Sequence, residues 1–335
     1  MRLTLERDVL LFFEDYDRDT FFKNDRRIRR ILRKSYHALR RERPKVTGFE
    51  VWFLLLKKAL ERAGRTVHVN AHRLAAHNPE FPVGVCGYPH GLEGWELPNP
   101  AVLGPGMFDH PAAHPELLGD SRFRLYVTTC DWNHALFAPV YGAERCVHWH
   151  AGIDIEEWPD LTFHPKDIDV LVYDKVRWHR DVLEKTMIGP ALDLIEARGL
   201  SAQVVRYGKY DHASYRELLA RSRTLLFLCE HETQGMAYQE AMASGLPVLA
   251  WDPGTWVDPQ SARYDSKPIP ACSVPFFDES CGDRFADAGS FESAVDRCWG
   301  RRETLNPRGF VREKLSLRES AELYLGHLAK AATRR

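Results

Sequence analysis

The sequence predicts an α/β fold with two doubly wound parallel-sheet domains. The chain has 335 residues, and since a single core seldom grows beyond about 250–300 residues, two domains are expected. Its apolar runs are short and bounded by turn residues. Helical patterns lie between successive runs, which is typical of parallel strands joined by crossover helices.

The first half contains six apolar runs that read as strands. They are Val9–Phe13, Thr66–Asn70, Val83–Gly87, Ala101–Leu103, Leu125–Thr129 and Arg145–His148. The second half contains four: Asp169–Tyr173, Ala202–Tyr207, Thr224–Cys229 and Pro247–Trp251. The stretch between the halves, residues 152–165, has two prolines, one tryptophan and several acids without a clear period. We therefore expect one domain over residues 1–157, a second over 158–310 and a C-terminal helix over 311–335.

Composition excludes several classes of protein. Hydrophobic residues make up 44% and charged residues 28%, as in globular rather than disordered chains. The formal net charge is -1, so the whole chain does not attract nucleic acid, and we expect no nucleic-acid partner. The seven cysteines are scattered, with no pair at zinc-ribbon spacing, which favours reduced thiols in a cytoplasmic protein. The apolar run Val9–Phe13 is too short for a membrane span.

A strongly basic segment, Lys23–Lys45, has apolar residues at helical spacing. One reading is a surface helix with a buried stripe and a solvated basic face. Another is a helix on anionic lipid, which would place the protein peripherally at the inner face of the membrane. Nucleic-acid binding is the weakest reading because no matching fold motif accompanies it.

The segment Leu225–Pro253 carries the clearest chemistry. A buried strand ends at Cys229, a polar turn follows, and a helix is predicted from Met236 through Ala243. Gly245 stands where a helix C-terminal cap belongs. The unpaired N–H groups of the first helical turn favour an anion such as a diphosphate. The turn predicted to bind this anion comprises Thr233, Gln234, Gly235 and Met236.

Two glutamates flank this turn. Glu232 lies in the loop, where it can accept hydrogen bonds from sugar hydroxyls, and Glu240 lies about one turn inside the helix, where it can bind ribose hydroxyls. Both partners are neutral hydroxyl donors, so two acids beside a phosphate site are chemically consistent. Gly235 permits close approach of the backbone.

Glu232-x7-Glu240, followed by Ala-Met-Ala-Ser-Gly-Leu-Pro-Val over residues 241–248, resembles the donor motif of the retaining glycosyltransferases of group 1. Sucrose synthase and bacterial mannosyltransferases typify that family. The resemblance implies a GT-B fold, with two Rossmann-like domains facing each other across a cleft. It also implies hexosyl transfer from a nucleoside-diphosphate sugar. It is specific from about Arg206 to Trp251 and looser elsewhere.

Looser matches extend the resemblance. Gly48, in Thr-Gly-Phe-Glu, stands for one glycine of the family's Gly-Gly-x-Glu loop, which contacts the donor phosphates. Gly152-Ile153-Asp154 resembles the sequence before the interdomain crossing. Residues 307–324 resemble the C-terminal helix that crosses back onto the first domain.

One family feature is altered. The family places an Arg and a Lys after the first strand of the second domain to hold the diphosphate. Here that strand is followed by Lys175, Arg177 and Arg180 in a different setting. We expect Lys175 and one of the two arginines to take this role, with helix capping or solvation as the alternative.

The resemblance also implies a functional histidine after a strand of the first domain. His110 is the candidate catalytic residue there, beside Glu232 in the second domain, and His90 and His134 are rivals. Neither a metal nor another cofactor is expected, and the nucleotide sugar serves as co-substrate.

The expected function is therefore retaining sugar transfer to a hydroxyl of a glycan, a polysaccharide or a lipid-linked acceptor, as in polysaccharide biosynthesis. Two alternatives stay open: an epimerase or phosphorylase on the same fold, and a non-catalytic subunit that binds nucleotide sugars.

Overall fold

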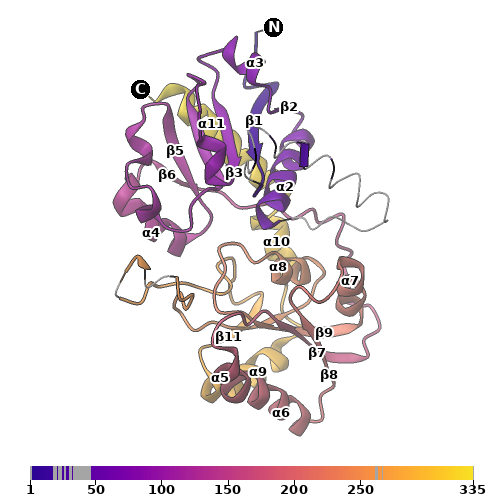
Figure 1. The fold of residues 1–335 in the computed structure, drawn as a ribbon. Helices are drawn as coiled ribbons and strands as arrows, with labels where there is room; N and C mark the ends of the chain where they lie inside the picture. Colours follow the sequence, from indigo (N-terminus) through magenta and orange to yellow (C-terminus); the bar gives the residue numbers. More distant parts are fainter. Residues whose placement is uncertain are drawn as a thin grey trace. The chain divides into compact units, whose positions relative to one another are not determined.

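The computed structural model describes residues 2–17, 21, 25, 28–29, 32, 47–260, 263–265 and 267–334. The chain divides into two compact units (Figure 1). Unit 1 comprises Met1–Thr129, His134–Gly152 and Ser320–Arg335, and unit 2 comprises Cys130–Asn133 and Ile153–Glu319.

Unit 1 contains a parallel six-stranded sheet with the order β2-β1-β3-β4-β5-β6. The strands are β1 (Asp8–Glu14), β2 (Thr66–Val69), β3 (Val83–Gly87), β4 (Ala101–Gly106), β5 (Phe123–Thr128) and β6 (Cys146–His148). After β1 the chain goes to β2 on one side and then returns to β3 on the other. The direction of winding therefore switches between β1 and β3.

Helices cover both faces of this sheet: α2 (Gly48–Arg62), α3 (His72–Ala76), α4 (Asp131–Tyr141) and part of α11 (Leu317–Thr333). Successive strand residues point to opposite faces. Phe12 packs in the core that includes Ala75 of α3 and Phe137 of α4. Phe13 points the other way and stacks on Phe53 of α2, with ring centroids 4.4 Å apart. Burial on both faces explains why the strands read as continuous apolar runs.

Unit 2 contains a parallel five-stranded sheet with the order β11-β10-β9-β7-β8. The strands are β7 (Ile168–Asp174), β8 (Ala202–Arg206), β9 (Ser222–Leu228), β10 (Val248–Trp251) and β11 (Gly282–Phe285). The chain passes from β7 to β8 on one side and then to β9 on the other, so the winding switches between β7 and β9.

Helices again cover both faces. They are α5 (Arg180–Leu183), which continues as a π-helix (Glu184–Ile188), α6 (Gly189–Ala197), α7 (His212–Arg221), α8 (Met236–Ala243), α9 (Ala288–Arg301) and α10 (Pro307–Lys314). One core joins Tyr173 and Phe227 to α7, α8 and α10. The other joins Val172 and Leu226 to α6 and α9.

These two parallel-sheet units confirm the predicted fold class, and all ten predicted strands are present. Strand β11 was not predicted because its sequence, Gly-Asp-Arg-Phe, is short and half polar. The single C-terminal helix expected over residues 311–335 is instead divided into α10 (Pro307–Lys314) and α11 (Leu317–Thr333). Helix α10 ends at Lys314, and the Leu315 carbonyl accepts a hydrogen bond from the Ile153 N–H (2.7 Å), so the chain leaves the helix there before α11 begins.

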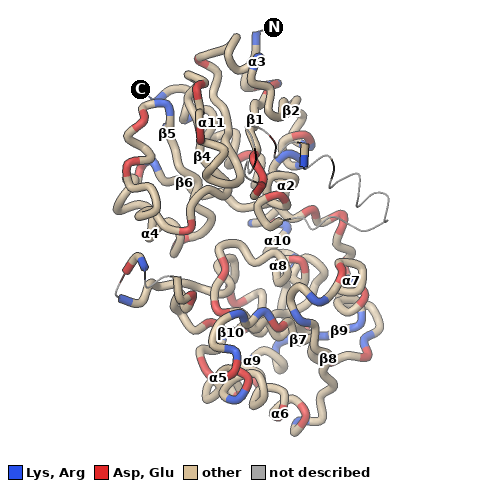
Figure 2. Tube along the Cα trace, in the orientation of Figure 1, with Lys and Arg blue, Asp and Glu red and all other residues tan. Residues whose placement is uncertain are grey.

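Charges of both signs are interspersed over the described chain of each unit (Figure 2). The basic segment Lys23–Lys45 lies outside the described residues, apart from four single positions, so its three readings stay predictions. Among the described helices, none combines the length and the apolar character needed to cross a membrane.

Candidate functional site

Most of the predicted site residues lie where the winding of unit 2 switches. Open parallel sheets bind ligands beyond the carboxyl ends of the strands at such a point. Two segments emerge there: residues 175–179 after β7 and residues 229–235 after β9. The Lys175 N–H donates to the Leu228 carbonyl (2.8 Å), which ties the two segments together.

The N-terminus of α8 has the geometry of an anion site. Gly235 is the N-cap residue and has a left-handed backbone, with φ 78° and ψ 56°. No described side chain caps the helix, so the N–H groups of its first turn remain for a ligand. A Cβ on Gly235 would lie 2.1 Å from Cε1 of Tyr238. Glycine is therefore required here for both its conformation and its size.

Glu232 and Lys175 form an ion pair beside this turn. The Lys175 ammonium donates to Oε1 of Glu232, and the Cys229 thiol donates to the same oxygen at 3.4 Å. Both side chains are mostly buried. Burial lowers the pKa of Lys175, but the Glu232 carboxylate more than offsets this, and the net pKa is raised. Lys175 therefore stays cationic at neutral pH.

The two predicted arginines have different surroundings. The Arg177 guanidinium lies over the ring of Trp178, 4.1 Å from its centroid. Arg180 donates to both carboxylate oxygens of Asp174 (2.9 and 2.6 Å) and to Glu184 (3.0 Å). Since these acids occupy Arg180, Arg177 is the better candidate to accompany Lys175.

Glu240 lies within hydrogen-bonding distance of His212, the first residue of α7, with 3.4 Å between Oε1 and Nε2. Burial raises the pKa of Glu240 despite the opposing effect of His212. The hydrogen bond to Glu240 raises the pKa of His212. His212 was not singled out from the sequence, and the only signal for it was its place after the helix-capping Asp211.

The rest of the predicted turn is structured from within. Gln234 is buried, and its amide donates to Oε1 of Gln239 (2.8 Å), while the Gln239 amide donates to the Gln234 carbonyl (2.8 Å). Thr233 and Met236 are partly exposed on either side of it. Gln234 therefore shapes the turn.

The two remaining predicted residues belong to unit 1. Gly48 is the exposed first residue of α2, and no atom lies within 4 Å of the position a Cβ would take. His110 is mostly buried, and its Nδ1 accepts the Ala112 N–H (3.1 Å), capping a short 3-10 turn. Because Nδ1 accepts, the neutral ring carries its proton on Nε2.

Besides His212, the structure adds two residues that the sequence reasoning missed. Glu230 has no exposed surface, and its Oε1 accepts the N–H groups of Arg177 (2.8 Å) and Trp178 (2.9 Å). His231 stacks on Trp178, with ring centroids 5.2 Å apart and planes 5° apart. An acid at the end of a buried strand was the available signal for Glu230.

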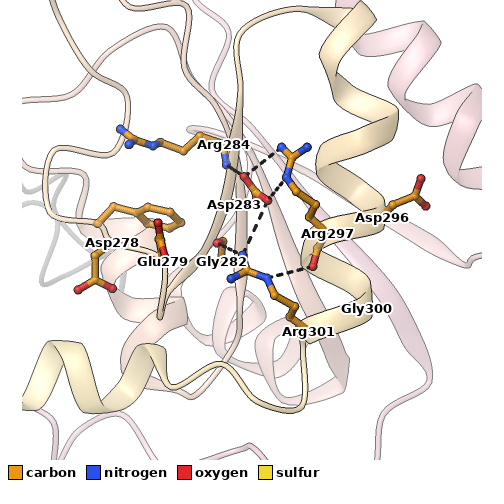
Figure 3. A pocket seen from close by; sticks show the side chains of 10 residues that line it. Asp278, Glu279, Gly282, Asp283, Arg284, Asp296, Arg297, Gly300 and Arg301 are labelled. Atoms are coloured by element: carbon orange, nitrogen blue, oxygen red, sulfur yellow. Dashed lines mark hydrogen bonds and ion pairs between the residues drawn. The ribbon is translucent and has the colours of Figure 1, made fainter.

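Two pockets lie away from these residues. In unit 1, a cavity of about 330 Å³ adjoins the switch between β1 and β3, and its lining includes Glu14, Asn70 and Trp95. In unit 2, an open pocket of about 830 Å³ lies between β11 and α9 (Figure 3).

The charged side chains that line this pocket lie along β11, the edge strand of the sheet. Asp283 accepts from Arg297 (2.7 Å) and from the N–H of Arg284 (2.8 Å), and Arg301 donates to the Gly282 carbonyl (3.2 Å) (Figure 3). These contacts occupy edge groups that would otherwise pair with another strand. The pocket is therefore explained by protection of the edge. Within the described residues, no group of three or more His, Cys, Asp or Glu side chains is arranged to hold a metal ion.

Residues 186–258 match the family model described as glycosyl transferases group 1. The matched segment runs from the π-helix to beyond β10 and contains Glu232, Gly235 and Glu240. A comparison with curated protein sequences found no match.

Among solved structures, a glycosyltransferase from Rickettsia africae ESF-5 is similar over 98% of this chain and 100% of its own, with 11% identity and a TM-score of 0.56. AviGT4, a glycosyltransferase involved in avilamycin A biosynthesis, is similar over 97% of this chain and 98% of its own, with 13% identity and a TM-score of 0.53. A chain of the GtfA/B complex is covered over 58% of its length, with 11% identity and a TM-score of 0.47. The first two similarities show the fold, which is GT-B with two Rossmann-like units.

Proposed function

We propose that this protein is a glycosyltransferase that moves a sugar from a nucleoside diphosphate to a hydroxyl acceptor with retention of anomeric configuration. One observation carries the proposal. The uncapped first turn of α8 lies between Glu232 and Glu240 in the chain, with Lys175 bound to Glu232 beside it. An anion site flanked by two carboxylates that can accept hydrogen bonds from hydroxyl groups fits a nucleotide sugar.

On this proposal, departure of the diphosphate is the difficult step. The helix N-terminus and the Lys175 and Arg177 cations stabilise the charge that develops on its oxygens. Glu240 accepts hydrogen bonds from the ribose hydroxyls and Glu232 from hydroxyls of the transferred sugar. Neither glutamate acts as a nucleophile.

Retention is supported by the resemblance of the Glu232-x7-Glu240 segment to the retaining family. In that mechanism the acceptor attacks from the face that the diphosphate leaves. The acceptor is a glycan, a polysaccharide or a lipid-linked glycan, and His110 of unit 1 is the proposed catalytic partner on its side. Metal independence and a cytoplasmic location stay predictions.

The first test is a thermal-shift screen of UDP-, GDP-, ADP- and dTDP-linked sugars against the wild type, Glu240→Ala and the control Glu303→Ala. Glu303 is 82% exposed. A ligand at a hundred times its Kd stabilises the native state by about 2.7 kcal/mol. One donor should therefore raise the Tm of the wild type and the control by about 5 °C or more, and Glu240→Ala should lose this shift.

The same screen separates the rival functions. If no nucleotide sugar shifts the wild type at millimolar concentration, the proposal is wrong. Product formation from free phosphate without a nucleotide would instead identify a phosphorylase. Isomerisation of the donor sugar would identify an epimerase. Donor binding without transfer or hydrolysis would support a non-catalytic subunit.

A further inference from the structure

Glu230 occupies an unusual position beside the proposed site. It is fully buried two residues beyond the end of β9 and two residues before Glu232. Its Oε1 accepts two consecutive backbone N–H groups, those of Arg177 and Trp178. Its other oxygen, Oε2, is buried and accepts no hydrogen bond from the described part of the chain. A carboxylate oxygen left in this state lowers stability, so packing alone does not account for a glutamate here.

The segment that Glu230 holds is the one that carries the proposed diphosphate cations. Lys175 and Arg177 lie on the turn between β7 and α5. This turn is attached to the end of β9 at three levels. The Lys175 N–H donates to the Leu228 carbonyl. The N–H groups of Arg177 and Trp178 donate to Glu230. The Trp178 ring stacks on His231. Glu230 is the acceptor in the middle of this attachment.

We infer that Glu230 is a positioning residue for the donor diphosphate, an inference that rests on the proposed function. It acts through the backbone of the turn, and it fixes where Lys175 and Arg177 lie relative to Glu232 and the N-terminus of α8. The role requires an oxygen that reaches both N–H groups. The negative charge of the side chain is not required.

Two substitutions separate reach from charge. Glu230→Gln keeps the length of the side chain and an oxygen that can accept both N–H groups, but removes the charge. Glu230→Asp keeps the charge but shortens the side chain by one methylene, so its oxygen withdraws from the turn. Glu303→Asp makes the same change at an exposed position and is the matched control.

The probes are UDP, GDP, ADP and dTDP with their matching monophosphates, and binding is measured by calorimetry. We expect the diphosphate that binds the wild type to bind Glu230→Gln and Glu303→Asp with nearly the same Kd. Glu230→Asp should bind it about tenfold more weakly, as for the loss of one or two hydrogen bonds. The monophosphate should be affected less, because it lacks the second phosphate on which Lys175 and Arg177 are proposed to act. A general loss of structure would weaken both ligands equally.

The outcomes are distinct. If the wild type binds no nucleoside diphosphate, the proposed function fails and the inference fails with it. If the wild type binds one and Glu230→Asp binds it equally well, the inference alone is wrong. A folded Glu230→Gln that loses diphosphate binding also overturns the inference, since charge rather than reach would then matter. If Glu230→Asp does not fold, the comparison of diphosphate binding by Glu230→Gln and the wild type still tests the inference.

Discussion

Gly235 has the backbone conformation on which the proposed phosphate site depends. Its positive φ turns the chain from β9 into α8 so that the first N–H groups of the helix are left without a side-chain cap in the described chain. An L-residue in this conformation is strained, and a Cβ would also meet the buried ring of Tyr238.

Gly235→Ala should lower the free energy of unfolding by about 2 kcal/mol or more, from backbone strain and displacement of Tyr238. It should also abolish the nucleotide shift. Urea denaturation and the thermal-shift assay measure the two effects. Gly300→Ala, in α9 with no atom within 4 Å of the added Cβ, is the control and should stabilise by about 0.5–1 kcal/mol. Equal stability of the two variants would contradict the argument.

His231 provides a pH signature of this site. Burial, followed by the charge of Arg177, lowers the pKa of its imidazole to about 4, compared with about 6.5 in the unfolded chain. Because the folded state favours the neutral ring, the contribution to stability is fully present above pH 6.5. It is lost as the pH falls from 6.5 toward 4, up to about 3 kcal/mol at 1.36 kcal/mol per pH unit.

His231→Phe keeps a ring against Trp178 but does not titrate. Between pH 7 and pH 5, urea denaturation should show a loss of stability that is about 2 kcal/mol smaller in His231→Phe than in the wild type. His212→Ala is the control, because Glu240 raises the pKa of His212, so its contribution is lost as the pH rises. An identical acid loss in His231→Phe and the wild type would show that His231 is not held neutral.

At the scale of elements, α8 is held at both ends by contacts from other segments. Near its N-terminus, the Tyr238 hydroxyl accepts the Phe276 N–H (3.0 Å) and the Tyr215 hydroxyl donates to the Ala237 carbonyl (2.8 Å). At its C-terminus, Arg308 of α10 donates to the Ala243 carbonyl and to the carbonyls of Trp158 (2.6 Å) and Ile155 (3.3 Å). These carbonyls include one that the helix itself leaves unpaired.

Arg308→Ala should therefore lower the free energy of unfolding by about 2–4 kcal/mol, since hydrogen bonds from a charged donor are lost and buried carbonyls remain. The free energy of unfolding of Arg308→Lys should lie between those of the wild type and Arg308→Ala. An ammonium group lacks the planar fork that reaches several carbonyls at once. Urea denaturation of the three proteins provides the measurement. A Lys variant as stable as the wild type would show that charge alone suffices.

At the scale of the whole molecule, the same winding occurs twice. Each unit begins a sheet with a central strand, adds a neighbour on one side and then continues on the other, so each has one switch point. In unit 2 this point gathers Lys175, Glu230, Glu232 and Gly235. In unit 1 it adjoins a cavity near Glu14. The chain passes between the units more than once, because residues 320–335 group with unit 1.

Local patterns in the sequence were sufficient for the fold class, for ten strands and for α8. Buried parallel strands need continuous apolar runs, and the turn into α8 needs a glycine, so both leave a local signal. Strand β11 and the break between α10 and α11 left none, because pairing with β10 and the contact of Leu315 with Ile153 decide them.

The sequence by itself therefore determined where strands alternate with helices, which turn carries Glu232 and Gly235, and which helix carries Glu240. Only the tertiary structure decided which side chains meet there. Lys175 forms an ion pair with Glu232, and Arg180 forms one with Asp174. Glu230 accepts hydrogen bonds from the turn that carries Lys175 and Arg177. The physical reason is that the contacts of Lys175 and Glu230 link residues more than fifty positions apart. The contact of Arg180 with Asp174 is local, but several charged residues lie close together in that segment of the sequence. Such choices depend on strand order and register, which no local pattern encodes.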